Sequence, residues 1–108
     1  MSVLGKWRIV AMPDYTDDYR DMMEPAYIVF EAHGSGELAF GCVTGQIFGS
    51  GDTDAVEFQW TGNDEMDEAQ GHGWAELQTD GSLKGQICFH GGDEAIFVAR
   101  RWTSSTAC

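Results

Sequence analysis

The sequence predicts a mainly β fold, in which an antiparallel meander of about seven strands closes into a small barrel with one short helix after the first strand. The clearest strand contains Val56, Phe58 and Trp60, which alternate with polar residues as expected where one face is buried and the other is wet. Tight-turn signals such as Asp80-Gly81 separate the apolar runs. Apart from the helix the connections are short, which favours antiparallel neighbours.

The first strand is expected over residues 5–12, because the apolar side chains of Trp7, Ile9 and Ala11 share one face of such a strand. Pro13 ends it, since proline has no amide hydrogen to donate to a ladder.

One helix is expected over residues 14–24. Thr16 or Asp17 caps it, acidic residues occupy its first turn where the helix dipole favours them, and Pro25 stops it. We expect it to lie across the barrel mouth as a mobile lid. Its apolar stripe consists of Tyr15, Tyr19, Met22 and Met23.

The next two strands are expected over residues 25–32 and 37–43. They form a hairpin, because the His-Gly-Ser-Gly segment at 33–36 is rich in residues that tolerate positive φ. Residues 45–49 either extend the third strand or begin a short extra one, and their glycines permit the bends that a small barrel needs.

The most individual stretch follows the strand at Val56. An acidic loop begins at Asn63, the next strand begins near Trp74, and the Asp80-Gly81 turn leads into a strand over residues 83–89. The last strand is expected over residues 94–102.

The length of 108 residues fits one domain, expected as a barrel over residues 1–102 with a flexible tail at 103–108. The net charge of −12, from 18 acidic and 6 basic residues, argues against direct nucleic-acid binding, which needs a basic footprint. It also disfavours docking on anionic membranes. Such acidity serves solubility and attracts a cationic ligand or a basic protein surface.

No segment has the apolar run of a signal peptide or the roughly 20 apolar residues of a membrane span, so a cytoplasmic location is expected. The three cysteines, Cys42, Cys88 and Cys108, contain no metal-type pair, and in a reducing compartment they are expected as free thiols.

Two groups of residues are candidates for metal binding or acid–base catalysis. The carboxylates of the acidic loop lack the spacing of an EF-hand, so we expect a solvated loop without a metal. A structural alternative is that the side chains of Asn63 and Asp64 bind backbone amides and fix the turn. His33, His72 and His90 flank glycines at strand ends, without a nucleophile elbow, a phosphate loop or a ligand pair beside them. The four loop carboxylates are Asp64, Glu65, Asp67 and Glu68.

The two ends of the barrel segment suggest a family. Gly5-Lys6-Trp7, together with Arg100-Arg101-Trp102, resembles the Gly-x-Trp start and C-terminal arginine of the calycin barrels, which include lipocalins, fatty-acid-binding proteins and avidins. The resemblance implies that Arg100 or Arg101 lies across Trp7 and helps to close one barrel end. Nearly the whole chain is also similar to a family of small uncharacterised bacterial proteins, through residues 5–7, 25–28, 62–65 and 71–75.

These features favour a binding module rather than an enzyme, with no cofactor. The first hypothesis is a small, partly apolar ligand, either neutral or cationic, at the mouth. It is held by Tyr15, Tyr19, Met22 and Met23 and oriented by Glu57, Glu76 or Arg8 where their faces point inward. The second is an acidic module that engages a basic protein partner or acts as a charge mimic, without an enclosed pocket. A third, an enzyme, requires His72 or His90 to converge with a carboxylate in a cleft.

Overall fold

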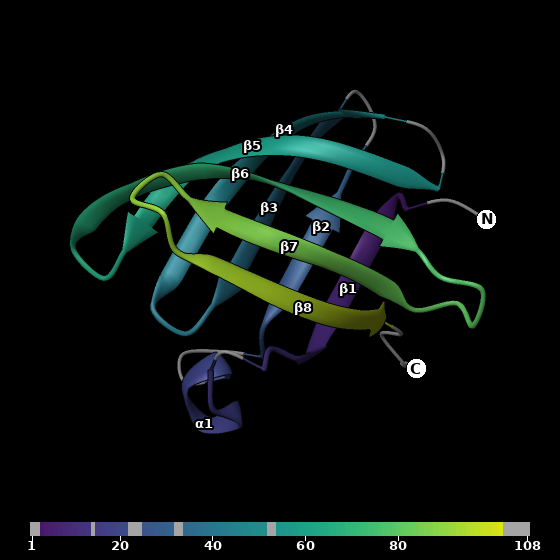
Figure 1. Ribbon diagram of the computed structural model, residues 1–108, viewed down its shortest axis with the longest axis horizontal. Coiled ribbons are helices and arrows are strands. Elements are labelled where there is room, and N and C mark those ends of the chain that lie inside the picture. Colours follow the sequence, from purple (N-terminus) through teal and green to yellow (C-terminus); the bar gives the residue numbers. More distant parts are fainter. Residues whose placement is uncertain (1–2, 14, 22–24, 32–33, 52–53, 103–108) are drawn as a thin grey trace.

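The computed structural model describes residues 3–13, 15–21, 25–31, 34–51 and 54–102. These residues form a single closed sheet of eight antiparallel strands, together with one short helix (Figure 1). The elements are β1 (Gly5–Ala11), α1 (Asp17–Arg20), β2 (Tyr27–Phe30), β3 (Ser35–Phe40), β4 (Val43–Gly51), β5 (Ala55–Asp64), β6 (Asp67–Leu77), β7 (Leu83–Phe89) and β8 (Glu94–Arg101).

Each strand pairs with the next along the chain, and β1 pairs with β8 to close the barrel. The closing ladder matches Trp7 with Arg101 and Arg8 with Arg100, and a bulge between Ile9 and Ala11 shifts its register. The predicted fold class, a mainly β antiparallel meander that closes into a barrel with a helix after the first strand, is therefore confirmed. α1 lies at one end of the barrel, and the start of β1 and the end of β8 lie toward the other (Figure 1).

The barrel has eight strands, one more than the seven expected. The additional strand is β4, which the sequence left open as either an extension or a short extra strand. It is separate because Gly41 adopts a φ of +54° and turns the chain back after β3. Tyr19 packs directly against this glycine, where a Cβ would collide with its ring.

The acidic loop is much shorter than expected, because β5 and β6 continue as a paired ribbon through most of it. The register runs from Ala55↔Glu76 to Asp64↔Asp67, so only Glu65 and Met66 remain in the turn. Glu65 has a φ of +58°, and its amide donates to the Cys42 carbonyl at 2.9 Å. Pairing with β4 as well as β6 supplies the backbone partners that keep this polar stretch extended.

The helix is one turn long, shorter than the expected 14–24 segment, of which residues 14 and 22–24 lie outside the described part. Thr16 is its cap, because the Thr16 hydroxyl accepts a hydrogen bond from the Tyr19 amide at 3.1 Å. Among the described residues, no helix is long and apolar enough to cross a membrane.

Buried side chains of the described residues occupy the barrel interior. Large rings lie opposite glycines on neighbouring strands. A Cβ at Gly85 would lie 2.6 Å from Cζ of Phe97, and one at Gly73 would lie 2.6 Å from Cζ of Phe58. Rings and glycines thus complement one another in volume, as a small barrel requires. The large side chains that are less than 2% exposed are Trp7, Trp60, Phe40, Phe97, Ile9, Ile28, Leu38, Ile47, Leu83, Ile87 and Val43.

Candidate functional site

Trp7 and Arg101 are opposite each other in the β1–β8 ladder, toward the barrel end away from α1 (Figure 1). The Trp7 ring is fully buried, and its indole N–H donates to the Val3 carbonyl at 2.9 Å. The Arg101 guanidinium lies over this ring, with its Cζ 4.0 Å from the ring centroid, and it donates to the Leu4 carbonyl. Of the two arginines proposed for this role, Arg101 covers the tryptophan, whereas Arg100 is exposed on the outer face.

Tyr15 and Tyr19, two of the predicted ligand residues, pack against the core at the α1 end. Their rings stack at 5.2 Å between centroids, and Tyr15 lies 5.6 Å from Phe40. Phe89 continues this cluster, with an edge contact to Phe40 at 6.3 Å. Met22 and Met23, the other two residues of the predicted stripe, lie outside the described residues.

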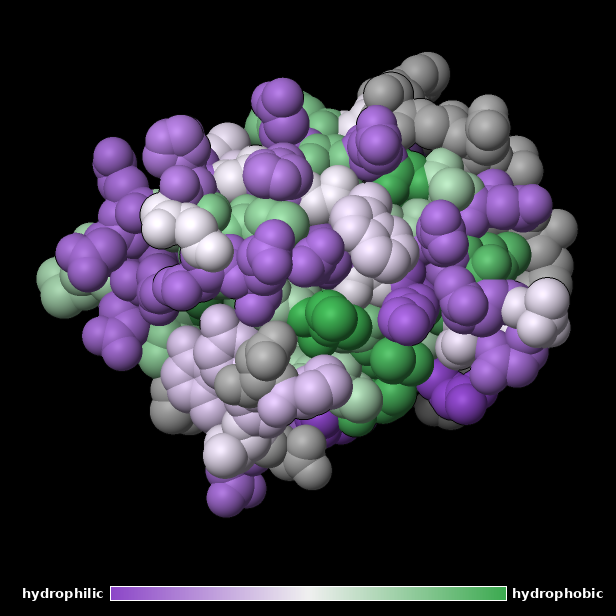
Figure 2. All heavy atoms as spheres, viewed as in Figure 1, coloured by the Kyte–Doolittle hydropathy of each residue, from purple (hydrophilic) through white to green (hydrophobic). Residues whose placement is uncertain are grey.

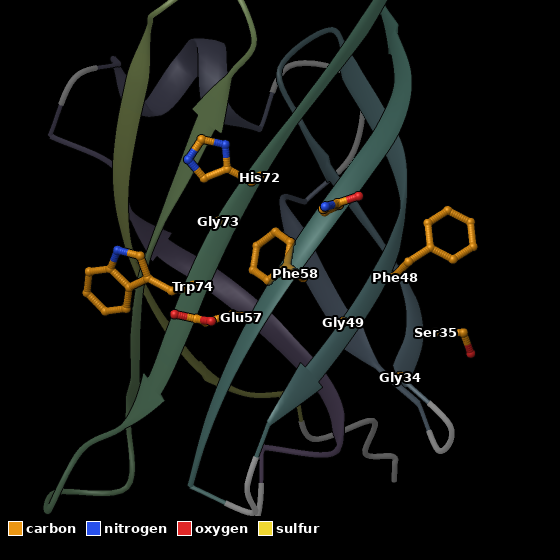
Figure 3. Close-up of a pocket in the computed structure, with 10 residues that line it drawn as sticks. Gly34, Ser35, Phe48, Gly49, Glu57, Phe58, His72, Gly73 and Trp74 are labelled. Carbon is orange, nitrogen blue, oxygen red and sulfur yellow. The ribbon is translucent and has the colours of Figure 1, made fainter.

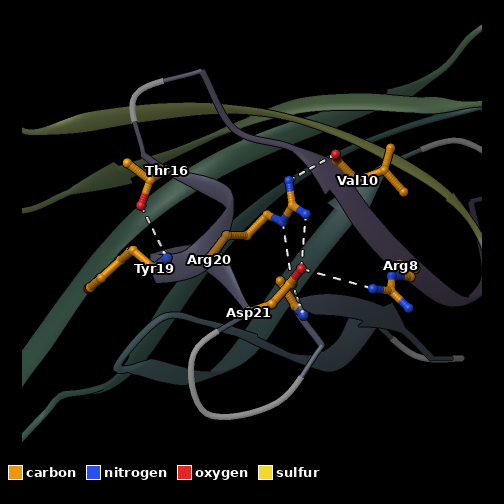
Figure 4. Close-up of polar contacts among 7 residues, drawn as sticks. Arg8, Val10, Thr16, Tyr19, Arg20 and Asp21 are labelled. Carbon is orange, nitrogen blue, oxygen red and sulfur yellow. Dashed lines mark hydrogen bonds and ion pairs between the residues drawn. The ribbon is translucent and has the colours of Figure 1, made fainter.

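Arg20 fastens α1 to the barrel (Figure 4). It is buried, and its guanidinium donates to the Val10 carbonyl at 2.9 Å and to the Asp21 carboxylate at 2.9 Å. Asp21 in turn accepts from the Ala26 amide at 3.0 Å and lies 3.9 Å from Arg8. The hydrogen bond from Arg20 holds the pKa of Asp21 below its ordinary value, and the Ala26 amide and the Arg8 charge act in the same direction.

Glu57 and Glu76, the predicted carboxylates, are exposed on the outside of the barrel, on β5 and β6. Their ladder positions lie toward the barrel end opposite α1, because Glu76 pairs with Ala55 at the start of β5. The structure therefore does not bring them together with Tyr15 and Tyr19. Arg8 is also exposed, beside Asp21.

A hollow of about 640 Å³ lies on the outer surface of β4, β5 and β6, and we call it the β4–β6 hollow. Glu57 and Trp74 are opposite each other in the β5–β6 register and lie side by side on one flank (Figure 3). Phe48, 57% exposed, projects from the other flank. The lining residues are Gly34, Ser35, Phe48, Gly49, Glu57, Phe58, Gln59, His72, Gly73 and Trp74.

Neighbouring strands hold the Trp74 ring in place. Its indole N–H donates to the Gln86 side-chain carbonyl at 3.1 Å, so one edge of the half-buried ring is fixed toward β7. The hollow thus offers a positioned aromatic ring, a carboxylate and an exposed second ring. This combination suits a ligand with apolar surface and a positive charge, since cations bind favourably over aromatic faces.

The strands around the hollow, β2 to β6, form a wall whose lysine- and arginine-free sequence gives it charge of one sign. Residues 21–83, which include β2 to β6, contain 13 acidic residues and no lysine or arginine. A cation that approaches this wall therefore meets no fixed positive charge on it. The six basic residues all lie on β1, α1, β7 and β8: Lys6, Arg8, Arg20, Lys84, Arg100 and Arg101.

A second, smaller hollow of about 350 Å³ adjoins the first and brings His72 and His90 to one surface. Its lining contains no carboxylate, but His72 also lines the first hollow, together with Glu57. His33 lies outside the described residues. The β4–β6 hollow therefore contains both His72 and Glu57, on neighbouring strands, but Figure 3 shows the two side chains apart, with Glu57 beside Trp74 rather than positioned against the imidazole for acid–base chemistry.

The β5–β6 turn places the carboxylates of Asp64 and Glu65 near the Cys42 thiol. Burial raises the pKa of the Cys42 thiol, and the nearby Glu65 and Asp64 raise it further, so Cys42 is a poor nucleophile. Burial likewise raises the pKa of the neighbouring Tyr19 phenol. Within the described residues, no group of three or more His, Cys, Asp or Glu side chains is arranged to hold a metal ion.

Comparisons with protein-family models, with curated proteins and with solved structures found no match to this chain.

Sequence reasoning missed Phe48 and the position of Trp74. Phe48 lies in the glycine-rich stretch that the sequence left open as an extension of the third strand or an extra strand. The face on which its side chain lies depends on where the β3–β4 turn begins β4, which the sequence did not determine. Trp74 was expected only as the approximate start of a strand, with no face assigned to its ring. Its alternation with Gly73 and Ala75, both buried, is the signal that places it on the outer face.

Proposed function

We propose that this protein is a binding module that holds a partly apolar, positively charged ligand in the β4–β6 hollow. One observation carries the proposal: the Trp74 ring and the Glu57 carboxylate lie together, on a wall without lysine or arginine. The carboxylate favours the cation electrostatically, while the ring gives it a face to stack on. The predicted ligand class is retained, and the site moves from the barrel mouth to the outer wall.

The filled interior supports this placement. Lipocalin-type barrels hold ligands inside, and eight strands leave just enough room for either side chains or one small ligand. Here the described interior is occupied by rings such as Trp60 and Phe97. We infer a calycin-like architecture from the eight-stranded meander and from Arg101 over Trp7, with the ligand outside the barrel.

The test is a titration with benzyltrimethylammonium, followed by amide chemical shifts. We expect saturable shifts at Phe48, Glu57, Gln59 and Trp74, and a much weaker response to neutral benzyl alcohol. Glu57→Gln and Trp74→Leu should each weaken binding by about 3- to 30-fold, the range of a cation–π or partly buried ionic contact. Glu76→Gln is the matched control, because Glu76 is outward-facing but does not line the hollow. Equal effects of both glutamate variants would contradict the proposal.

A second candidate is the acidic module for a basic protein partner. The observation that favours it is the 13 acidic residues and absence of cations over residues 21–83. A lysine-rich peptide is the probe. In this mode binding depends on the summed charge of the wall and weakens steeply with salt, whereas Glu57→Gln alone changes little. Retention of peptide binding in high salt would exclude it.

A further inference from the structure

The outer face of β8 carries a short row of side chains with an ordered chemistry. Alternate residues point outward, and in chain order these are an acid, two apolar residues and a base. Glu94 and Arg100 are exposed, Ile96 is 42% exposed and Val98 is half-buried. Glu94 and Arg100 each lie three residues from Phe97, so the row is symmetric in position and opposite in charge about its centre.

Apolar surface widens this row toward β1. The bulge in the β1–β8 ladder lies at Val10, which is 39% exposed. Figure 2 shows apolar side chains gathered over β8 and its border with β1, with hydrophilic groups around them. Val10, Ile96 and Val98 thus form an apolar centre within a charged rim, the pattern of a protein–protein contact.

The cations on this side, Arg100 beside Asp80 included, lie near acids or rings of the same chain. Lys6 lies 4.3 Å from the Trp102 ring centroid and 4.6 Å from that of Tyr27. Arg8 lies 3.9 Å from Asp21. Lys84 is opposite Glu76 in the β6–β7 register. The β8 face is therefore close to neutral, whereas the rest of the barrel carries most of the net charge of −12.

We propose that the β8 face binds a second copy of this chain in a two-fold symmetric dimer. When two such strands pack antiparallel about an axis at Phe97, Glu94 of each copy faces Arg100 of the other, and the apolar centres meet. A two-fold contact requires a self-complementary surface, and this charge order supplies one. At a packing distance of about 10 Å between sheets, the long arginine side chain reaches its partner even when the strands cross at about 30°.

This orientation also agrees with the charge of the whole protein. The acidic walls of two copies point away from each other, since β4 lies opposite β8 in the closed strand order. The β4–β6 hollow stays open in the dimer. A contact through any of β2 to β6 would instead bring the acidic side chains of the two copies together, and they would repel each other.

Sedimentation velocity over a range of protein concentrations tests the proposal. Wild-type protein should show a reversible monomer–dimer equilibrium, with dimer at high micromolar concentration. Glu94→Arg and Arg100→Glu should each weaken the dimer at least tenfold, because each sets like charges opposite one another. The double variant Glu94→Arg, Arg100→Glu should restore dimerisation, since the swap recreates both pairs.

The single variants separate the specific contact from a general charge effect. They change the net charge in opposite directions, so general repulsion would strengthen association in Glu94→Arg and weaken it in Arg100→Glu. Such opposite effects of the two single variants would overturn the proposal. So would a double variant that stays monomeric while folded, or a wild type that is monomeric at every concentration. Ile96→Lys, which places a charge in the apolar centre, should also abolish the dimer, and circular dichroism would verify that each variant folds.

Discussion

Gly85 illustrates how single residues set the packing of this barrel. The Phe97 ring covers it so closely that a Cβ would lie 2.6 Å from Cζ of that ring, and the Trp74 carbonyl approaches it from the neighbouring strand. A methyl group there must displace a buried ring or the backbone, and overpacking of this kind costs about 1–3 kcal/mol. We therefore expect Gly85→Ala to lower the free energy of unfolding by that amount in urea denaturation.

Gly91 is the matched control for this substitution. It lies in the exposed turn between β7 and β8, with no atom within 4 Å of an added Cβ. Gly91→Ala should change the free energy of unfolding by less than about 0.5 kcal/mol or raise it slightly. Equal losses in the two variants would show that the ring does not confine Gly85.

Trp7 and Arg101 give a second prediction at the residue scale. Trp7→Ala removes a fully buried ring and should cost about 3–5 kcal/mol in the free energy of unfolding. Arg101→Gln keeps the core intact but removes the cation over the ring, and should cost about 0.5–2 kcal/mol. Lys84→Gln is the control, since Lys84 is an exposed cation on β7 away from Trp7. A loss below about 1 kcal/mol in Trp7→Ala would contradict the barrel-end role.

Asp21 gives a pH-dependent prediction. Its pKa is lower in the folded protein than the ordinary 3.8, chiefly because Arg20 donates to the ionised carboxylate. The contribution to stability is therefore present above the unfolded pKa and is lost as pH falls through the folded pKa. At pH 7 we expect Asp21→Asn to lower the free energy of unfolding by about 1 kcal/mol, the typical net value of such a hydrogen bond.

The measurement is urea denaturation from pH 7 downward, with Asp67→Asn as an exposed control that leaves stability unchanged. The difference between wild type and Asp21→Asn should shrink below about pH 3.8 and vanish in stronger acid. A difference that persists there would mean that the ion pair is not its source.

At this scale the sequence predicted some residues and not others, for a physical reason. The burial of Trp7 follows from alternation within a clear strand. The position of Glu57 beside Trp74 follows from the pairing of β5 with β6, which alternation within either strand does not determine. The predicted ligand residues that the structure describes therefore lie in two separate places.

Among the elements, α1 gives the clearest prediction. A single turn of helix has little intrinsic stability, so its order depends on Tyr15, Tyr19 and Arg20 packing against the barrel. Strand β5, paired on both sides, should open far less often. We expect amides of α1 to exchange with solvent much faster than those of Val56 to Trp60. Equal protection in both would exclude the role of α1 as a mobile lid.

The strand elements were largely predictable, and their ends were not. Turn residues with strong preferences, such as Asp80-Gly81, marked the hairpin between β6 and β7. Ser82 stabilises this turn, because both its amide and its hydroxyl donate to the Asp80 carboxylate. The β5–β6 turn uses Glu65 at positive φ, a residue with no strong turn signal, so its position depended on the pairing around it.

For the whole molecule, the net charge of −12 predicts a response to salt. Acidic side chains over residues 21–83 repel one another in the compact state, and added salt screens that repulsion. Raising the ionic strength from about 0.01 M to 1 M shortens the screening length from about 30 Å to 3 Å. We expect the melting temperature at low protein concentration to rise by several degrees in sodium chloride. A fall would indicate that favourable ion pairs outweigh the repulsion.

The ladder between β1 and β8 makes the strand order circular, so the barrel itself contains no first or last strand. The Trp102 amide donates to the Lys6 carbonyl at 2.9 Å, which shows how near the two described ends lie. Joining them with a short linker and opening the chain at Gly81 should therefore give a circular permutant with the same eight ladders. In that permutant the closing ladder becomes a local hairpin and the β6–β7 hairpin becomes the long-range contact. A changed folding pathway with an unchanged native structure would follow, because loop closure is redistributed around the same ring.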